Sequence, residues 1–315
     1  MKVVYMGTPG YATYPLEKLL SGGHDIVGVF TQPDRQAGRG RQMKPPPVKV
    51  AAESNGLDVF QPKSLRSESC VTALEKLRPD IIVIAAYGII LPPAVLRIPA
   101  VGSLNIHPSL LPLYRGPTPV ATAILNGDPV TGVTIMEVDE GTDTGRVIVQ
   151  QEERIKDEDT TLDLTYRLFK KGASLLEQQI TDYSEGKIRL SEQEETKATY
   201  TEKLAKNSGE IDWGQPAINI WRQVKAYTPW PGSYTMWNNK RIKLLDVWPG
   251  DLNINPIAET GAVLVDETKR PYVCSVQTGR GLLTLKTIQL EGKQATGIEA
   301  FVNGRPDFAK ANLAR

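Results

Sequence analysis

The first half of the chain alternates short apolar runs with amphipathic segments, and this alternation constrains the fold more than any other feature of the sequence. The apolar runs cover residues 2–7, 25–30, 80–88 and 101–107. Each run is apolar throughout, which is typical of a strand buried on both faces of a parallel sheet. Segments with helical spacing lie between these runs, at 14–23 and 71–78, and after the last of them, at 119–128. We therefore predict an α/β domain built on a mostly parallel sheet that helices cover on both sides.

The second half of the sequence has a different texture. A long helical segment at 159–183 is followed by a polar stretch with few large apolar side chains, which we interpret as a linker at 190–206. Beyond it, short β-like runs alternate with Gly, Pro and Asn, as in a small β-barrel or sandwich. The 315 residues are therefore predicted to form an α/β domain at 1–189, the linker, and a β domain at 207–315.

The composition argues against several classes of protein. The formal net charge is only +1, so no overall field draws the chain to nucleic acid or to a membrane. The chain contains two cysteines, Cys70 and Cys274, and two histidines, which argues against a disulfide framework, a structural zinc site or a His-rich metal site. No run reaches membrane-spanning length, and the N-terminal apolar run is too short for a signal peptide. We expect a soluble, cytoplasmic protein that needs no metal.

A basic segment at residues 33–49 stands out against this neutral background. Its cations are Arg35, Arg39, Arg41, Lys44 and Lys49, and its single acid is Asp34. A run of this kind is about as often a solvated loop as an arm that contacts phosphates. Because two glycines and many polar residues leave it no core of its own, we expect it to be disordered or mobile when the protein is alone. Residues 207–315 are also mildly basic, with 13 Lys and Arg against 10 Asp and Glu.

Three polar residues occur where an α/β sheet presents its ligand site. Asn105 and His107 lie at the end of a predicted strand and share its parity, so their side chains point to the same side. Asp143 lies in the polar segment "DEGTDTG" between two β-rich runs. An amide could hold an oxyanion, an imidazole could carry a proton, and a carboxylate could orient the imidazole and stabilise its charge. No Ser or Cys stands in a nucleophile elbow, which favours direct group transfer.

Taken singly, each of these residues has an ordinary structural interpretation. A strand-end histidine is more often a buried structural residue, and an asparagine or aspartate in a Gly-flanked turn is usually a turn former or a cap. The segment "MGTPGYA" after the first strand lacks the spacing of G-x-G-x-x-G, so it predicts a tight turn and not a dinucleotide site.

Taken together, the motifs resemble those of the formyltetrahydrofolate-dependent formyltransferases. The similarity rests on "NIHPSLLPLYRGPTP" with "DEGTDTG", and extends to "VVYMGTP", "QPDRQAGRGRQMKPPPVK", "AAYGIILP", "GEIDW" and "AYTPWPGSYT". These segments span essentially the whole chain and are similar in particular to the family members that formylate methionyl-tRNA. The resemblance implies a Rossmann-like transferase domain followed by an OB-like barrel that binds tRNA.

The resemblance also implies roles for individual residues. Asn105, His107 and Asp143 would be catalytic, with Asp143 expected to raise the pKa of His107 by ion pairing. The folate-binding residues would be Ser109, Leu110, Leu111, Pro112, Tyr87, Gly88, Ile90 and Leu91. The residues that contact tRNA would be Arg35, Arg39, Arg41 and Lys44. The donor would be 10-formyltetrahydrofolate, the acceptor the α-amine of methionyl initiator tRNA, and the protein a monomer.

Two positions depart from the family pattern, and alternatives to this function stay open. Gly10 stands where an acid is frequent and Leu113 where a basic residue is frequent, which bears on the tRNA contacts near Leu113. A sugar N-formyltransferase or a formyltetrahydrofolate hydrolase would share the catalytic trio. A nucleic-acid-binding module with an inactive enzyme domain, or a nucleotide-sugar or NAD-dependent enzyme, would not require it. The basic segment at 33–49 favours a tRNA acceptor.

Overall fold

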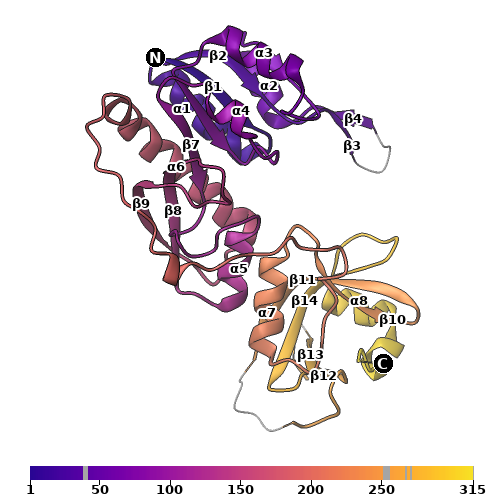
Figure 1. Cartoon of the computed structure of the whole chain (residues 1–315). Helices are drawn as coiled ribbons and strands as arrows, with labels where there is room; N and C mark the ends of the chain where they lie inside the picture. The colour runs from indigo at the N-terminus through magenta and orange to yellow at the C-terminus, as the bar shows by residue number, and fades with distance from the viewer. Residues whose placement is uncertain (38–41, 251–255, 267, 270–271, 315) are drawn as a thin grey trace. The chain divides into compact units, whose positions relative to one another are not determined.

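The computed structural model describes the whole chain except residues 38–41, 251–255, 267, 270–271 and 315 (Figure 1). Contacts divide it into two compact units. The first unit comprises residues 1–119, 130–154 and 165–201, and the second comprises 120–129, 155–164 and 202–315. The segment predicted as a linker therefore packs with the first unit as far as residue 201. The functional boundaries at 189 and 207 stay predictions.

The first unit is built on a seven-stranded sheet of order β5-β2-β1-β6-β7-β8-β9. Its strands are β1 (Lys2–Gly7), β2 (Asp25–Phe30), β5 (Val59–Phe60), β6 (Ile81–Ala85), β7 (Gly102–His107), β8 (Val130–Glu137) and β9 (Val147–Arg154). Strands β5, β2, β1, β6 and β7 pair in parallel, and β8 and β9 join antiparallel. The predicted mostly parallel, Rossmann-like sheet is confirmed.

The strand order reverses direction between β1 and β6. The chain runs from β1 outward to β2 and β5, then returns to β6 and continues to β7 on the other side. In open α/β sheets, ligands bind beyond the carboxyl ends of the strands at such a reversal. A hydrogen bond of 2.9 Å from the Thr8 hydroxyl to the Tyr87 carbonyl joins the two strand ends at this point.

Helices cover both faces of the sheet, and this cover buries the central strands β1 and β6 on both sides. Cys70 and Leu74 of α3 (Glu68–Leu77) pack with Val4 and Ile82, which point to one face. On the other face, a Cβ added at Gly172 of α6 (Thr161–Ser184) would lie 2.6 Å from Ile106, so only glycine allows this close approach. The remaining helices of the first half of the chain are α1 (Thr13–Ser21), α2 (Pro47–Ser54), α4 (Pro93–Leu96) and α5 (Pro119–Asn126). Short 3-10 turns occur at Gly10–Ala12, Glu195–Lys197 and Pro306–Lys310.

The second unit contains an antiparallel sheet of order β10-β11-β14-β13-β12, with β15 beside β14. Its strands are β10 (Ser233–Trp237), β11 (Lys240–Pro249), β12 (Val263–Asp266), β13 (Val273–Gln277), β14 (Leu282–Leu290) and β15 (Thr296–Gly297). Two helices, α7 (Ala217–Ala226) and α8 (Ile298–Gly304), contribute Ile220 and Phe301 to its core. The predicted β domain is confirmed, although the sequence analysis did not anticipate α7, β10 or α8.

The basic segment contains more regular structure than predicted. A two-stranded ribbon forms from β3 (Arg35–Ala37) and β4 (Gln42–Lys44), with Arg35 opposite Lys44. The expectation of disorder is therefore wrong for these residues, because backbone pairing gives them order without a core, while the expectation of mobility stays a prediction. Arg39 and Arg41 lie outside the described residues. Over the part of the chain that the structure describes, no helix combines the length and apolarity needed to cross a bilayer.

Candidate active site

The sheet places Asn105 and His107 at the carboxyl end of β7. Strands β6 and β7 run in parallel with Ile84 beside Asn105, so the two strands end at the same edge of the sheet. Because paired residues of neighbouring strands point to the same face, Asn105 and His107 share the α3 face with Ile82 and Ile84. Their parity was predictable from the sequence, and their position next to the strand-order reversal follows from the fold.

His107 is held between a carbonyl and a carboxylate. Its ring Nε2 lies 3.0 Å from the carbonyl oxygen of Tyr114. Since a carbonyl only accepts hydrogen bonds, Nε2 carries the proton. The other nitrogen, Nδ1, lies 3.6 Å from Oδ2 of Asp143, with the two side chains only 4% and 19% exposed. In a neutral ring Nδ1 is thus an unprotonated base that faces an anion.

Asp143 reaches the histidine from the loop between β8 and β9. Its backbone adopts φ +54°, a left-handed conformation that aspartate tolerates better than most residues. Its Oδ2 accepts a 2.8 Å hydrogen bond from the backbone amide of Gly116. This bond fixes the carboxylate beside the imidazole and joins the loop to the segment that follows β7. The structure therefore brings the predicted histidine and aspartate together.

Burial and neighbouring groups act on the pKa of His107 in opposite directions. Burial lowers the pKa of His107 below its usual value, because the low-dielectric surroundings disfavour the imidazolium. Asp143 and the Tyr114 carbonyl raise this pKa, but by less than burial lowers it. The expected contribution of Asp143 therefore has the right sign, although burial outweighs it. His107 in the free protein is consequently neutral at pH 7.

Asn105 leaves its side-chain amide available. The residue is half-buried, and within the described part of the chain this amide makes no hydrogen bond. A half-buried amide normally finds a partner, since an unpaired polar group is costly away from water. Asn105 is therefore suited to donate a hydrogen bond to a ligand at the end of β7.

The segment Ser109–Pro112 is anchored on β8 and β9 through one buried threonine. The Thr134 hydroxyl donates to the carbonyl of Ser109 at 2.6 Å and accepts from the amide of Leu111 at 3.2 Å. Gln150 donates to the Leu111 carbonyl at 2.7 Å and to the Thr134 hydroxyl at 2.9 Å. Ser109 and Leu111 are buried, while Leu110 and Pro112 are half-buried. The backbone of this predicted folate segment is thus rigidly held.

The second predicted folate segment follows β6 at the same edge of the sheet. Gly88 has φ +80°, where a Cβ would collide with the side chain of Gln32. Gln32 donates to the Tyr87 carbonyl at 3.0 Å, which holds the turn against the end of β2. Tyr87 is buried and Leu91 packs against the α3-side core, whereas Ile90 is 86% exposed. Ile90 is therefore the residue of this segment most available to a ligand.

The start of the segment that carries the predicted tRNA-contacting residues is held in place by hydrogen bonds around Asp34. Lys49 donates to both carboxylate oxygens of Asp34 at 3.0 Å and to Gln61 at 2.9 Å. The pKa of Asp34 is lowered by its hydrogen bonds to Gln61 and Lys49. Arg35 donates to Gln32, and both Arg35 and Lys44 are exposed. Because Lys49 is engaged in these contacts, the described cations that project from the ribbon are Arg35 and Lys44.

The two departures from the family pattern have different surroundings. A Cβ at Gly10 would lie 2.5 Å from the Tyr166 hydroxyl, so an acidic residue here requires Tyr166 to move. Leu113 is 42% exposed, and its carbonyl accepts a 2.6 Å hydrogen bond from the Ser109 hydroxyl. The backbone of Leu113 is thus fixed by this hydrogen bond, while its exposed side chain can be replaced by another residue type without disturbing that bond.

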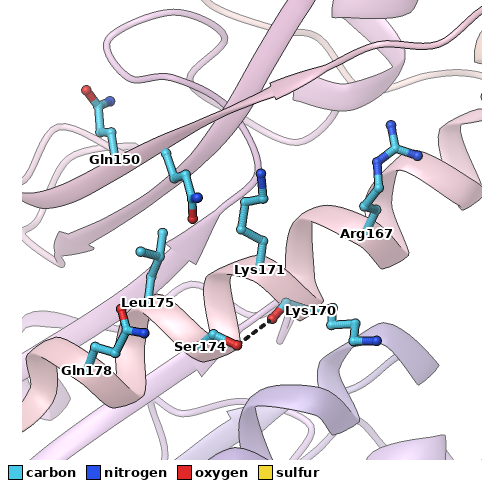
Figure 2. A pocket seen from close by; sticks show the side chains of 8 residues that line it. Gln150, Arg167, Lys170, Lys171, Ser174, Leu175 and Gln178 are labelled. Carbon is cyan, nitrogen blue, oxygen red and sulfur yellow. Dashed lines mark hydrogen bonds between the residues drawn. The ribbon is translucent and has the colours of Figure 1, made fainter.

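A separate hollow lies between β9 and α6 (Figure 2). Its volume is about 520 Å³, and none of the catalytic trio lines it. Figure 2 shows Arg167, Lys170 and Lys171 on α6 with Gln150 on β9. Arg167 and Lys171 are both paired with Glu153, so this one carboxylate offsets one of the three positive charges of the hollow. Within the described ranges, no three His, Cys, Asp or Glu side chains come together as a metal-binding set.

Both halves of the chain match models of one enzyme family. Residues 1–180 match the formyl transferase model and residues 203–306 match the formyl transferase C-terminal domain model. A methionyl-tRNA formyltransferase from Chloroflexus aggregans is 45% identical over 96% of this chain and 97% of its own. Another from Dehalococcoides mccartyi strain CBDB1 is 45% identical over 99% of this chain and 98% of its own. The chain belongs to the methionyl-tRNA formyltransferase family.

Solved structures with the formyltransferase fold are more distant in sequence. The sugar 3N-formyl transferase WlaRD, crystallised with dTDP and 5-N-formyl-THF, has a TM-score of 0.64 at 19% identity, covering 93% of this chain and 99% of its own. HypX from Aquifex aeolicus, in complex with tetrahydrofolic acid, also scores 0.64 at 18% identity, covering 96% of this chain and 47% of its own. At this identity the likeness supports the fold alone.

Three residues at the site of this formyltransferase escaped the sequence analysis. Tyr114 acts through its carbonyl, which no side-chain pattern reveals. Arg115 is 1% exposed and Gln193 is half-buried, although Gln193 lies in the segment predicted as a linker. The only available signal was an arginine inside the "LYRGPTP" motif.

Proposed function

We propose that this protein transfers the formyl group of 10-formyltetrahydrofolate to the α-amine of methionyl initiator tRNA, with Asn105, His107 and Asp143 as catalytic residues. The observation that carries the proposal is the 45% identity to methionyl-tRNA formyltransferases over both halves of the chain. The convergence of His107 and Asp143 at the end of β7, beside an unpaired Asn105 amide, supports it independently.

Formyl transfer requires a stabilised oxyanion. The α-amine attacks the formyl carbon, a new C–N bond forms, and the carbonyl electrons move to oxygen in a tetrahedral intermediate. The Asn105 amide is the donor for this oxygen. Loss of one such donor typically costs about 3 kcal/mol, or roughly 10² to 10³ in rate. The intermediate collapses when the carbon–N10 bond breaks and oxygen regains its double bond.

Proton transfer accompanies this collapse. The amine must lose a proton and the folate nitrogen N10 must gain one. Neutral His107 has a basic Nδ1, while its Nε2–H is engaged by the Tyr114 carbonyl. Once Nδ1 is protonated, it faces the Asp143 carboxylate, which stabilises the imidazolium. The positive charge of His107 can then stabilise the oxyanion that Asn105 holds, and the proton returns from Nδ1 to N10, directly or through a water.

The folate is placed at the edge that β6 and β7 share. The anchored segment Ser109–Pro112 and the exposed Ile90 would flank the pterin ring, with main-chain groups available to its polar edge. We predict that Gly88→Asp weakens folate binding without unfolding the protein, and a folate located elsewhere in a crystal would contradict this placement.

The basic ribbon is proposed to hold the acceptor end of the tRNA. Arg35 and Lys44 are opposite each other in the β3–β4 pairing, and the sequence places Arg39 and Arg41 between them, outside the described residues. Arginine and lysine on an exposed ribbon can neutralise phosphates, which makes binding depend on salt. Replacing Arg35 and Lys44 by Ala should therefore weaken tRNA binding and flatten its salt dependence.

The trio is tested by single-turnover formylation with Asn105→Ala, His107→Ala and Asp143→Ala. Each variant is expected to slow transfer by at least ~10² while folate and tRNA binding persist. Near-normal turnover by His107→Ala would show that the assigned role is wrong. A sugar N-formyltransferase with the same trio is not favoured, because the full-length relatives act, by name, on methionyl-tRNA.

A further inference from the structure

The segment 191–201 is hydrogen-bonded on both sides to the parts of the chain that hold His107. At one end, Ser191 and Val147 at the start of β9 exchange backbone bonds of 2.8 and 3.0 Å. At the other end, Thr201 donates to the Arg115 carbonyl at 2.8 Å, and Arg115 donates to the Thr199 carbonyl at 2.9 Å. The segment thus spans from the Asp143 loop to the residues after β7.

Gln193 makes the contact nearest to the catalytic pair. Its amide nitrogen donates to the carbonyl oxygens of Asp143 at 2.8 Å and Gly145 at 2.7 Å. Its amide oxygen accepts a 3.1 Å hydrogen bond from the Nε of Arg115. Along 191–197, every residue of which the structure describes, Gln193 is the one that is half-buried while its neighbours are exposed.

Arg115 connects this amide to the outer part of the segment. Its NH1 donates to both carboxylate oxygens of Glu195, at 3.1 and 2.9 Å, and to the Tyr200 hydroxyl at 2.7 Å. The guanidinium carbon also lies 5.5 Å above the Tyr200 ring. A buried arginine with this many partners has little freedom to move, so it fixes the orientation of the Gln193 amide.

We infer that Gln193 is a positioning residue for the reaction: its amide, oriented by Arg115, holds the backbone of Asp143 so that the carboxylate faces Nδ1 of His107. This inference rests on the proposed function of the trio. It also assigns a task to residues 191–201, which complete the active site in addition to leading the chain into the second unit. Misplacing a catalytic group by about 1 Å can cost 10²-fold in rate, so a single amide at this point is consequential.

The left-handed backbone of Asp143 explains why the loop needs the hydrogen bond from Gln193. At φ +54° this residue lies in a sparsely populated region that persists when surrounding contacts hold it. Gly116 holds the carboxylate of Asp143, and Gln193 holds its carbonyl. Without Gln193, the loop keeps only the first of these two contacts.

The test uses Gln193→Met, which preserves length and removes the two N–H donors. Glu194→Gln is the matched control, because Glu194 is adjacent, exposed and paired with Lys197 away from the trio. We expect kcat of Gln193→Met to fall at least ~10-fold with KM for both substrates changed less than ~3-fold, and Glu194→Gln to match the wild type.

A second readout does not depend on activity. His24 and His107 are the only two histidines in the sequence, so His24→Asn leaves one imidazole to follow by ¹⁵N NMR during a pH titration. The groups that act on this ring are the Asp143 carboxylate, which raises the pKa of His107, and the Tyr114 carbonyl. Displacing Asp143 should therefore lower the pKa of His107 in Gln193→Met relative to the His24→Asn background.

The outcomes separate this inference from the proposed function. Absence of formyl transfer to methionyl-tRNA by the wild type would contradict the function itself. Suppose instead that the wild type transfers the formyl group and that His107→Ala abolishes the transfer. An unchanged kcat and an unchanged His107 titration in Gln193→Met would then overturn the positioning role alone. Gln193→Ala, which leaves room for water, serves as the second variant should Gln193→Met fold poorly.

Discussion

Thr134→Val is the substitution that most sharply tests how the Ser109–Pro112 segment is held. Thr134 is completely buried, and its hydroxyl takes part in three hydrogen bonds, with Ser109, Leu111 and Gln150. Valine has nearly the same shape, so the change removes the hydroxyl without opening a cavity. Two of the three partners, the Ser109 carbonyl and the Leu111 amide, belong to buried residues and lose this bond.

The expected cost follows from these two groups. A buried polar group without a partner costs about 1–3 kcal/mol, so losing both bonds should lower the free energy of unfolding of the first unit by about 2–6 kcal/mol. Gln150→Leu is the comparison: it removes the hydrogen bond to the Leu111 carbonyl but leaves both Thr134 backbone contacts in place, so a smaller loss of about 1 kcal/mol is expected.

The assay must report on the first unit. All five tryptophans lie beyond residue 206, so intrinsic fluorescence follows the second unit and serves as an internal control. Hydrogen exchange of amides in β8, read by mass spectrometry in increasing urea, follows the first. A loss below ~0.5 kcal/mol for Thr134→Val, or one equal to that of Gln150→Leu, would refute the assignment of Thr134 as the anchor.

Three further predictions concern charge and packing. Burial lowers the pKa of His107 in the folded state below its unfolded value of about 6.5, so the unfolded chain binds this proton more tightly. The free energy of unfolding should therefore be highest above about pH 6.5 and should fall as the pH drops towards the folded pKa. Urea midpoints measured across this range should fall less steeply for His107→Asn. Gly145→Ala would press a Cβ against the Glu137 carbonyl, so we expect about 1–3 kcal/mol of destabilisation by hydrogen exchange in the β8–β9 loop. Thr235→Val removes the hydroxyl that accepts a 3.1 Å hydrogen bond from the buried Trp213 indole. The free energy of unfolding of the second unit, followed by tryptophan fluorescence, should therefore fall by about 1–3 kcal/mol.

Much of the fold was predictable because parallel strands that are buried on both faces consist of continuous apolar runs. The segments that became β1, β2, β6 and β7 were identifiable from residue type alone. Residues whose structure depends on backbone pairing were not, as the β3–β4 ribbon shows. Helix α7 was missed because its apolar residues occur among Trp, Arg and Gln in a region dominated by β-like runs.

The candidate site was predictable in its side chains but not in its environment. Parity brought Asn105 and His107 together, and the resemblance located Asp143. The sign of the net pKa shift of His107 depends on how deeply its ring is buried, which strand parity does not reveal. Likewise, the contacts of Gln193 join residues 50 positions apart through backbone carbonyls, and no pattern in the sequence encodes such pairing.

The central claim is that this chain formylates methionyl initiator tRNA through the trio at the end of β7. The most direct measurement supplies labelled 10-formyltetrahydrofolate together with methionyl initiator tRNA, methionyl elongator tRNA and an amino sugar nucleotide in separate reactions. The account predicts label on the α-amine of the initiator methionine, with transfer abolished by His107→Ala and Asp143→Ala. Label on the sugar, release of free formate alone, or transfer that survives both substitutions would contradict it.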